Sequence, residues 1–313
     1  RGENENDSSD MTKKWFTYIV EEFFNLNYGL FKKCTDGTYH PNHTSFVNEK
    51  HLDYFRLAGE ITALALIRGQ FIPAHFSKSF LRQILHQMIN FYDLEAFDDE
   101  IFRSVKYTLE TENAEDLCLS FLIDVEILGE LKTIELVKDG ENIDVTNENR
   151  DLYVALYTYY KLRESMLDQI KAFCSGFNAL IPADIIKFFT PKELDLMIHG
   201  ISKFDVKDFQ AHAKYKSPYM KDHVIIQLFF KVISCWSQND LSKLLKFITG
   251  SSQLPLNGFK DFEEEGHPIT IAYSSDCAKL PIAHTCCNTL YLPKYKTEKD
   301  MNEKLLVAVN NLQ

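Results

Sequence analysis

Apolar residues recur at helical spacing through the first two hundred residues. Trp15, Ile19, Phe23, Leu26 and Leu30 follow one another at intervals of four, four, three and four. This spacing places one apolar stripe on one face of a helix, so that face must pack inward. The same pattern predicts further helices, with apolar positions at Leu52, Phe55, Gly59, Ala63 and Leu66; at Phe80, Ile84 and Met88; and, along one longer helix, at Leu152, Leu156, Met166, Ile170, Phe173 and Phe177.

Two local signals add detail to this helical region. Thr190, Pro191 and Glu193 stand in the order of a capping box with a proline at the first helical position, and Gly200 stands where a left-handed terminator belongs. They predict a helix over residues 191–199. Between about residues 115 and 145, β-rich runs at 119–125 and 134–137 predict a small strand-containing subdomain inserted between helices.

The remaining residues mix helical and strand patterns. Ile201, Ser202 and Lys203 (residues 201–203) carry no periodic pattern and form a candidate hinge. The segments beyond them predict two helices, a half-buried strand and a capped last helix, at Val224, Leu228 and Val232; at Leu241, Leu244, Leu245 and Ile248; at Ile269, Ile271 and Tyr273; and at Thr297 with Met301, Leu305, Val309 and Leu312. We expect a polar segment over 1–10, a mostly helical domain over 11–200 and a small α+β domain over 204–313.

Composition narrows the class of protein. With 313 residues, 45% of them hydrophobic, the chain can build two well-packed cores. Its 45 acidic and 34 basic side chains give a formal charge of -11, which disfavours binding to nucleic acid. No apolar run approaches the length that crosses a bilayer, so we expect no membrane insertion and a cytoplasmic and/or nuclear protein. Because it begins with Arg1, we expect the chain to be part of a longer protein.

The cysteines direct attention to one segment. Seven cysteines are an odd number and are widely scattered, so a disulfide framework is not expected. Residues 280–295 read LPIAHTCCNTLYLPKY, with a proline near each end and with His284 two residues before Cys286. If the segment is extended, both side chains point the same way. An imidazolium or backbone N–H groups nearby would lower the pKa of the thiol and favour the nucleophilic thiolate.

This segment resembles the active-site signature of HECT ubiquitin ligases. The resemblance continues in FITGSS at 247–252, LPLNGF at 254–259, YFRLAG at 54–59, TNENR at 146–150 and FTPKEL at 189–194, all in the order of the family, and it covers about residues 15–312. It implies a bilobal HECT domain of α+β class. It also implies that Cys286 accepts ubiquitin as a thioester from a ubiquitin-conjugating enzyme and passes it to lysines of protein substrates.

The resemblance also suggests roles for other residues. The hinge at 201–203 falls where the family joins its lobes, and rigid-body motion there would let one thiol meet two partners. The family's docking groove for the conjugating enzyme would fall on Ile101, Val105, Leu109, Leu117 and Leu119, which could instead be the core of the small subdomain. His284, Thr285 and Asn288 belong to the active-site loop, where each can equally serve to shape the turn.

Two departures from the family pattern remain open. Cys287 stands where the family usually has an aromatic residue; it either fills part of a core pocket or acts as a second thiol that competes for ubiquitin or oxidises with its neighbour. The chain stops at Gln313, where the family usually continues with a short tail containing a phenylalanine. If that tail is missing, thioester formation is expected to survive while lysine transfer is impaired.

The alternatives to a ligase are weaker. A zinc site at Cys277, His284, Cys286 and Cys287 has unsuitable spacing, because adjacent cysteines cannot easily take two tetrahedral positions, and we expect neither a metal nor a cofactor. A catalytically silent scaffold that only binds ubiquitin or the conjugating enzyme is disfavoured by the intact signature. A cysteine hydrolase would need histidine and acidic or amide partners, and nothing in the sequence marks them.

Overall fold

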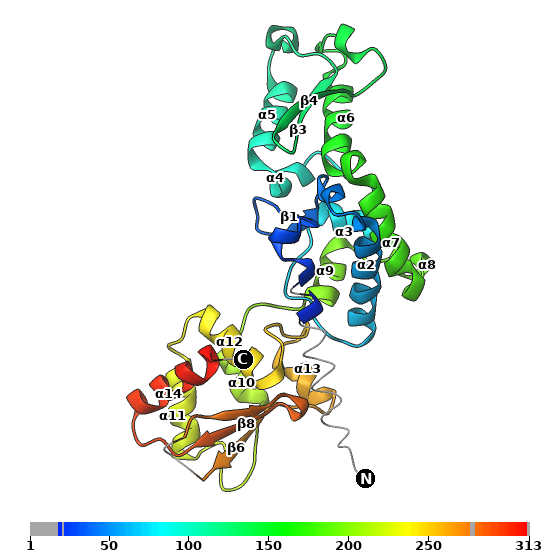
Figure 1. Ribbon diagram of the computed structural model, residues 1–313. Coiled ribbons are helices and arrows are strands. Elements are labelled where there is room, and N and C mark those ends of the chain that lie inside the picture. Colours follow the sequence, from blue (N-terminus) through cyan, green and yellow to red (C-terminus); the bar gives the residue numbers. More distant parts are fainter. Residues whose placement is uncertain (1–17, 21, 276–278, 312–313) are drawn as a thin grey trace. The chain divides into compact units, whose positions relative to one another are not determined.

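The computed structural model describes residues 18–20, 22–275 and 279–311, and these fall into two compact units. The N-terminal unit comprises Val20–Arg68 and Ala74–Asp195. The C-terminal unit comprises Gly69–Pro73 and the residues from Leu196 onward. Each unit combines helices with short strands (Figure 1), so the predicted α+β class is confirmed. The boundary between the units lies between Asp195 and Leu196, five residues before the end at residue 200 that the sequence predicts for the first domain.

Two long helices pack against each other in the N-terminal unit. Helix α2 (His51–Ile67) and helix α7 (Leu167–Leu180) lie side by side (Figure 1). A Cβ atom on Gly59 would collide with the carbonyl oxygen of Phe173, and one on Gly176 would collide with that of Arg56. The two glycines therefore let the helix backbones touch. The other elements of this unit outside the small subdomain are η1 (Leu26–Tyr28), β1 (Phe31–Lys33), β2 (Tyr39–Pro41), η2 (Ser45–Val47), α3 (Lys78–Ile84), α4 (Asp93–Phe97) and α8 (Ala183–Ile186).

Two of the predicted helices end before the last residues of their apolar stripes. Of the first stripe, Trp15 lies outside the described residues, Leu26 lies in η1, and Leu30 follows Gly29, whose φ of 61° is left-handed. Helix α3 ends at Ile84, and Met88 is 88% exposed. Left-handed backbone cannot continue an α-helix. Of the stripe residues beyond these helix ends, Leu30 is buried, whereas Leu26 and Met88 are exposed.

The predicted long helix is two helices. Helix α6 (Arg150–Leu162) ends at Arg163, which has φ −141° and ψ −60°. One turn of 3-10 helix, η5 (Glu164–Met166), precedes α7, and Figure 1 shows α6 and α7 following one another. Leu152 is 55% exposed, whereas Met166, Ile170, Phe173 and Phe177 are buried. The periodic pattern spans the break because both helices bury one face of their own.

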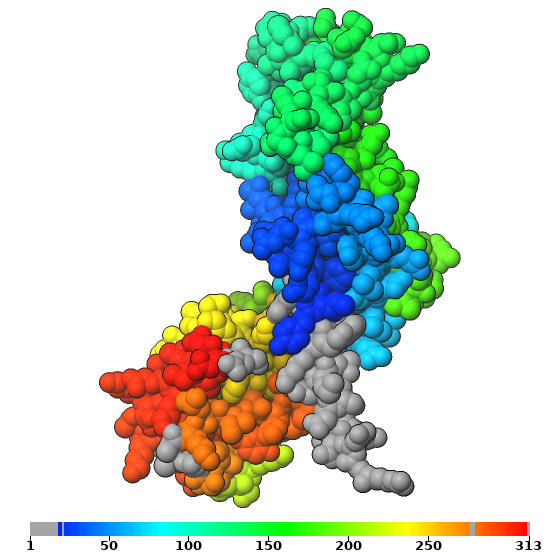
Figure 2. Space-filling model, in the orientation of Figure 1, coloured from blue at the N-terminus to red at the C-terminus, as the bar shows by residue number. Residues whose placement is uncertain are grey.

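The small inserted subdomain has the predicted strands. Strands β3 (Leu122–Ile127) and β4 (Glu130–Glu135) form an antiparallel hairpin between α5 (Asp99–Glu110) and α6 (Figure 1). Its core contains the buried Val105, Phe121, Val145 and Tyr153. The remaining elements here are η3 (Ala114–Leu117) and η4 (Gly140–Asn142). In the space-filling view this subdomain forms one end of the N-terminal unit (Figure 2).

The predicted capping box at residues 190–193 is confirmed. The Glu193 amide donates to Thr190 Oγ1 at 3.2 Å, and the Thr190 amide donates to Glu193 Oε2 at 2.7 Å. Helix α9 (Pro191–His199) follows and ends at Gly200, whose φ is 67°. The hydrogen bond from the Thr190 backbone lowers the pKa of the Glu193 carboxyl, which keeps this cap charged.

The C-terminal unit is built on a four-stranded sheet in the order β5–β6–β8–β7, formed by β5 (Lys214–Tyr215), β6 (Thr270–Ser274), β7 (Ile282–His284) and β8 (Thr289–Pro293). Strands β6 and β8 are parallel, whereas β7 is antiparallel to β8 and forms an edge. Leu290 and Leu292 of β8 and Ile271 of β6 are fully buried. Strand β6 confirms the strand expected near Ile271, although Ala272 beside it is buried as well, so burial in β6 does not alternate strictly.

Helices cover the core of this sheet. The helices predicted at 224–232 and 241–248 are α11 (Val224–Ile233) and α12 (Gln238–Thr249), and the capped last helix is α14 (Glu298–Asn310). Thr297 Oγ1 accepts from the Asp300 amide at 3.1 Å, as the capping pattern predicts. Met301, Leu305 and Val309 are buried, and Leu312 lies outside the described residues. Helices α10 (Val206–His212) and α13 (Phe259–Glu264) complete the unit.

The segment proposed as a hinge is partly held by the C-terminal unit. Ile201 forms an isolated antiparallel bridge with Leu254, with hydrogen bonds of 2.7 Å and 2.9 Å between their backbones. Ser202 and Lys203 are exposed and have no regular secondary structure. Any rotation about this segment is therefore expected to involve Ser202 and Lys203 more than Ile201.

Candidate active site

Cys286 lies in a tight turn between two paired strands. Strand β7 ends at His284, one turn of 3-10 helix, η6 (Thr285–Cys287), follows, and strand β8 begins at Thr289. His284 pairs directly with Thr289 across the antiparallel ladder. The ladder therefore fixes both ends of the loop, and Cys286 occupies the middle of the turn.

The extended geometry considered from the sequence stops short of the cysteine. The backbone is extended through His284 and then turns into η6. The alternation that would point His284 and Cys286 the same way therefore does not reach Cys286. The reason is the turn itself, because Asn288 takes a left-handed conformation (φ 46°, ψ 43°) that reverses the chain into β8.

Asn288 anchors this turn to the sheet. Its side chain is 6% exposed, and Nδ2 donates to the carbonyl oxygen of His267 at 2.8 Å. Its own carbonyl oxygen accepts from the Thr270 amide at 2.9 Å. Asparagine is one of the few residues that enter the left-handed region readily. These contacts assign Asn288 a loop-shaping position, with its side chain directed at backbone groups near the start of β6.

His284 lies on the side of the sheet opposite to the core. Directly paired residues lie on the same face of a sheet, and Ala283 pairs with the buried Leu290. Its neighbours in β7, Ile282 and His284, therefore lie on the opposite face. The imidazole of His284 is exposed and meets the ring of Tyr291 edge-on, with 5.1 Å between centroids. This contact orients the imidazole beside the loop.

Thr285 lies against the end of helix α12. Gly250, which terminates α12 with φ 83°, would place a Cβ atom 3.7 Å from the Cβ atom of Thr285. Thr249, the last residue of this helix, forms a compact cap, in which its Oγ1 donates to the Leu245 carbonyl and accepts from the Ser251 amide. Thus the FITGSS segment, which the sequence links to the catalytic loop only by resemblance, does pack on that loop.

The two adjacent cysteines differ in exposure. Cys286 is half-buried, whereas Cys287 is exposed. The thiol of Cys287 donates to Thr289 Oγ1 at 3.2 Å. Its exposure excludes the interpretation that Cys287 fills a core pocket. Burial raises the pKa of Cys34 to about 11 and that of Cys174 to about 12, so those two thiols stay protonated at neutral pH and are poor nucleophiles.

The five residues proposed for docking gather around the subdomain core. Val105 is 4% exposed and belongs to that core, against which Ile101, Leu109 and Leu119 pack while partly exposed. Leu117 is also partly exposed, at the end of η3. A docking surface needs exposed side chains, so the buried Val105 cannot contact a partner directly.

The described residues contain neither a metal-binding cluster nor a membrane-spanning helix. Among the described residues, no group of three or more histidine, cysteine, aspartate or glutamate side chains is arranged to hold a metal ion. Of the helices in the described segments, none is both long and apolar enough to cross a bilayer. Cys277, one of the residues weighed as a zinc ligand, lies outside the described residues.

Sequence reasoning missed two contributors to this site. Tyr291 carries the ring that orients His284, and His267 supplies the carbonyl oxygen that holds Asn288. The register of β7 against β8 could have indicated Tyr291, once the loop length was known. The bond from Asn288 to His267 joins residues that are distant in sequence, and no local pattern signals it.

Comparisons with known proteins agree with these features. The family model described as HECT-domain (ubiquitin-transferase) matches residues 17–313. The chain is 38% identical over 312 residues, or 98% of its length, to an E3 ubiquitin-protein ligase RSP5 of Emericella nidulans, and 38% identical over the same share to a probable E3 ubiquitin-protein ligase hulA of Aspergillus terreus. It is 36% identical, over 99% of its length, to an E3 ubiquitin-protein ligase pub3 of Schizosaccharomyces pombe.

The matched regions cover nearly the whole chain but only part of each relative. The chain spans 38% of the first two relatives and 40% of the third. The resemblance drawn from the active-site loop and the order of the other motifs is thus confirmed at the level of the family, and the bilobal α+β architecture with it. The chain belongs to the HECT-domain (ubiquitin-transferase) family.

Proposed function

We propose that this chain is a ubiquitin-protein ligase that carries ubiquitin as a thioester on Cys286. The observation that supports this most directly is the position of Cys286, half-buried in a turn whose ends are pinned by β7 and β8 and whose exit is held by Asn288. A turn held at both ends presents a thiol without a large loop rearrangement. The family of the chain supplies the class of reaction.

The reaction consists of two acyl transfers. The Cys286 thiolate attacks the carbonyl carbon of the thioester between ubiquitin and the conjugating enzyme, and the enzyme's own thiolate leaves. A deprotonated lysine amine of a substrate then attacks the new thioester, forms an amide and releases the Cys286 thiolate. Exchange between thioesters is nearly balanced in energy, so it requires little beyond positioning and an accessible thiolate.

An adduct assay tests this function. The chain is incubated with activating enzyme, conjugating enzyme, ATP and ubiquitin, and the products are separated with and without a thiol reductant. A ligase forms a ubiquitin adduct that the reductant removes. A scaffold that only binds ubiquitin or the conjugating enzyme forms none, and a hydrolase consumes ubiquitin conjugates without accumulating one. Absence of the adduct would overturn the proposal.

For docking of the conjugating enzyme, we propose the partly exposed side chains on the subdomain, Ile101, Leu109, Leu117 and Leu119. Three of them pack on a common buried core that includes Val105, which would keep their exposed parts in fixed positions. Burial of apolar side chains is the main source of affinity at such surfaces. The exposed Tyr107 on α5, at 62%, adds an aromatic group of the kind enriched in interfaces.

The docking proposal separates binding from folding. Leu117→Ala is expected to raise the concentration of conjugating enzyme needed for half-maximal adduct formation at least fivefold, with little change in unfolding free energy. Val105→Ala serves as the contrast, because it should destabilise the unit by about 1–3 kcal/mol through loss of buried methyl groups. Equal adduct formation by Leu117→Ala and the unmodified chain, at limiting conjugating enzyme, would exclude Leu117 from the surface.

For the hinge, we propose that Ser202 and Lys203 are the residues that change conformation, while Ile201 moves with the C-terminal unit. The bridge between Ile201 and Leu254 supports this division. Replacing Ser202 and Lys203 together by proline would restrict their backbone dihedrals. We expect this double variant to slow ubiquitin transfer at least tenfold while the unfolding transition stays within about 1 kcal/mol. Unchanged transfer would place the movement elsewhere.

A further inference from the structure

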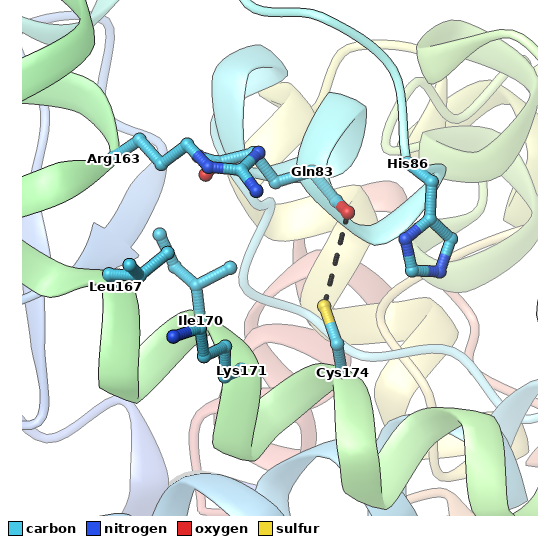
Figure 3. A pocket seen from close by; sticks show the side chains of 7 residues that line it. All are labelled: Gln83, His86, Arg163, Leu167, Ile170, Lys171 and Cys174. Atoms are coloured by element: carbon cyan, nitrogen blue, oxygen red, sulfur yellow. Dashed lines mark hydrogen bonds between the residues drawn. The ribbon is translucent and has the colours of Figure 1, made fainter.

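A cavity of about 180 Å3 lies within the N-terminal unit, beside the break between α6 and α7. Figure 3 shows Arg163 and Gln83 along one side, and the α7 residues Leu167, Ile170, Lys171 and Cys174 along the other, with His86 at one end. None of the seven lining residues carries a negative charge, and two carry a positive one. The cavity is therefore an electropositive site with an apolar wall.

Gln83 directs an unpaired acceptor to this cavity. Its side chain is 3% exposed, and Nε2 donates to the carbonyl oxygen of Leu162 at 2.9 Å. That bond sets the orientation of the amide, because only the nitrogen can donate. The other atom, Oε1, is buried and has no hydrogen-bond partner among the described residues. A buried acceptor without a donor costs about 1–3 kcal/mol, so a bound donor here would be stabilising.

Arg163 supplies the complementary donor. Its Nε atom is buried and, within the part of the chain that the structure describes, has no hydrogen-bond partner. The guanidinium lies over an aromatic ring, 5.9 Å from the ring centre of Tyr159. A second cation, Lys171, stands at the rim with 66% of its side chain exposed, 4.0 Å from Asp168.

The remaining walls are apolar and unreactive. Leu167 and Ile170 present aliphatic side chains from α7. The Cys174 thiol donates to the backbone carbonyl of Gln83 at 3.9 Å. Burial raises the pKa of Cys174 to about 12, so the thiol adds no negative charge that would oppose an anion. An incoming ligand thus meets a cation and an acceptor on one side of the cavity and an alkyl surface on the other.

We propose that this cavity binds a small 2-hydroxy carboxylic acid with a short branched alkyl chain. The carboxylate accepts from Arg163 Nε–H, the hydroxyl donates to Gln83 Oε1, and the alkyl chain packs on Leu167 and Ile170. A plain anion such as phosphate would satisfy Arg163 but leave the aliphatic wall without a contact. An alcohol or amide of the same shape would leave the guanidinium unpaired. Occupancy would link α3 to the junction of α6 and α7 and so stabilise the N-terminal unit.

A matched series of ligands tests the proposal without any variant. Binding of 2-hydroxyisovalerate is measured by calorimetric titration and by the shift of the melting temperature. Isovalerate lacks the hydroxyl and 2-hydroxyisovaleramide lacks the charge. Each is expected to bind roughly tenfold more weakly, because each leaves one buried polar group unpaired. Inorganic phosphate is the fourth probe and is expected to give no saturable binding in the same concentration range.

Variants place the binding at this cavity. Arg163→Met is expected to abolish the titration and the melting shift given by 2-hydroxyisovalerate. Arg103→Met removes one positive charge from an exposed helix position in the same unit and should leave both unchanged. Equal affinity for the acid and its amide, equal affinity for isovalerate, preferential binding of phosphate, or retained binding by a folded Arg163→Met would each overturn the proposal. Since the ligand series uses the unmodified chain, a folding defect in the variant leaves the test decisive.

Discussion

The side-chain amide of Asn288 donates a 2.8 Å hydrogen bond to the backbone carbonyl of His267, which ties the cysteine loop to the segment that enters β6. Asn288 also holds the left-handed conformation that turns the chain from η6 into β8. One residue thus sets both the direction of the chain after Cys286 and its attachment to the sheet. This attachment helps to fix the position of the thiol two residues earlier in the chain.

Two substitutions at Asn288 separate these contributions. Asn288→Gly keeps the left-handed conformation and loses the bond to His267, so it should lower the unfolding free energy by about 1 kcal/mol. Asn288→Ala loses the bond and adds the backbone cost of a Cβ atom, for a total of about 2–3 kcal/mol. Chemical denaturation measures both. Equal losses in the two variants would show that the backbone conformation contributes nothing to the anchor.

Substitution of Gly200 should be costly for two reasons. Its φ is 67°, and a Cβ atom would lie 2.5 Å from the Leu254 carbonyl oxygen and 3.0 Å from the ring of Phe71. Gly200→Ala should therefore lower the unfolding free energy by more than about 2 kcal/mol. Gly69→Ala is the matched control, because Gly69 has φ 61° with open space around it and should lose only about 1 kcal/mol. Similar losses at both positions would rule out the steric contribution.

Stability of the N-terminal unit should fall in mild acid because of His40. The imidazole is fully buried, with Nδ1 2.6 Å from Ser77 Oγ and Nε2 3.2 Å from the Leu162 carbonyl oxygen. Burial lowers the pKa of His40 from 6.5 to about 3, so between these values the unfolded chain binds the proton and the folded chain does not. The contribution is complete above pH 6.5 and is lost as pH falls, by about 1.4 kcal/mol per pH unit.

Denaturation curves at pH 7, 6 and 5 measure this dependence. In His40→Phe, which cannot titrate, the slope of unfolding free energy against pH should be smaller by up to about 1.4 kcal/mol per pH unit. Comparing slopes, not absolute stabilities, removes the effect of lost hydrogen bonds. An unchanged slope in the variant would assign the acid sensitivity to other groups.

Local patterns in the sequence predict the features that depend on neighbouring residues. The capping box of Thr190 and Glu193 and the cap at Thr297 are confirmed because each joins residues three apart. The helix break at Arg163 escapes prediction, since the apolar stripe continues across it. The sequence also does not predict the unpaired buried atoms of Gln83 and Arg163. These residues come together only when α3 packs beside the junction of α6 and α7.

The same distinction holds at the active-site loop. Cys286 is identified by motifs that lie along the chain, and family membership rests on those motifs. The sequence does not predict the conformation of Cys286, because the turn at Thr285–Cys287 is imposed by strand pairing and by Asn288. Asn288 in turn bonds to His267 and Thr270. A sequence pattern with a period of two cannot anticipate a turn that tertiary contacts create.

The most direct test of the central claim compares serine substitutions at the two adjacent cysteines. With activating enzyme, conjugating enzyme, ATP and ubiquitin, Cys286→Ser should form an oxygen ester with ubiquitin that survives thiol reductant and is cleaved by hydroxide, while Cys287→Ser should keep a reductant-sensitive adduct. A reductant-sensitive adduct on Cys286→Ser, together with a reductant-resistant one on Cys287→Ser, would contradict the account and assign ubiquitin transfer to Cys287.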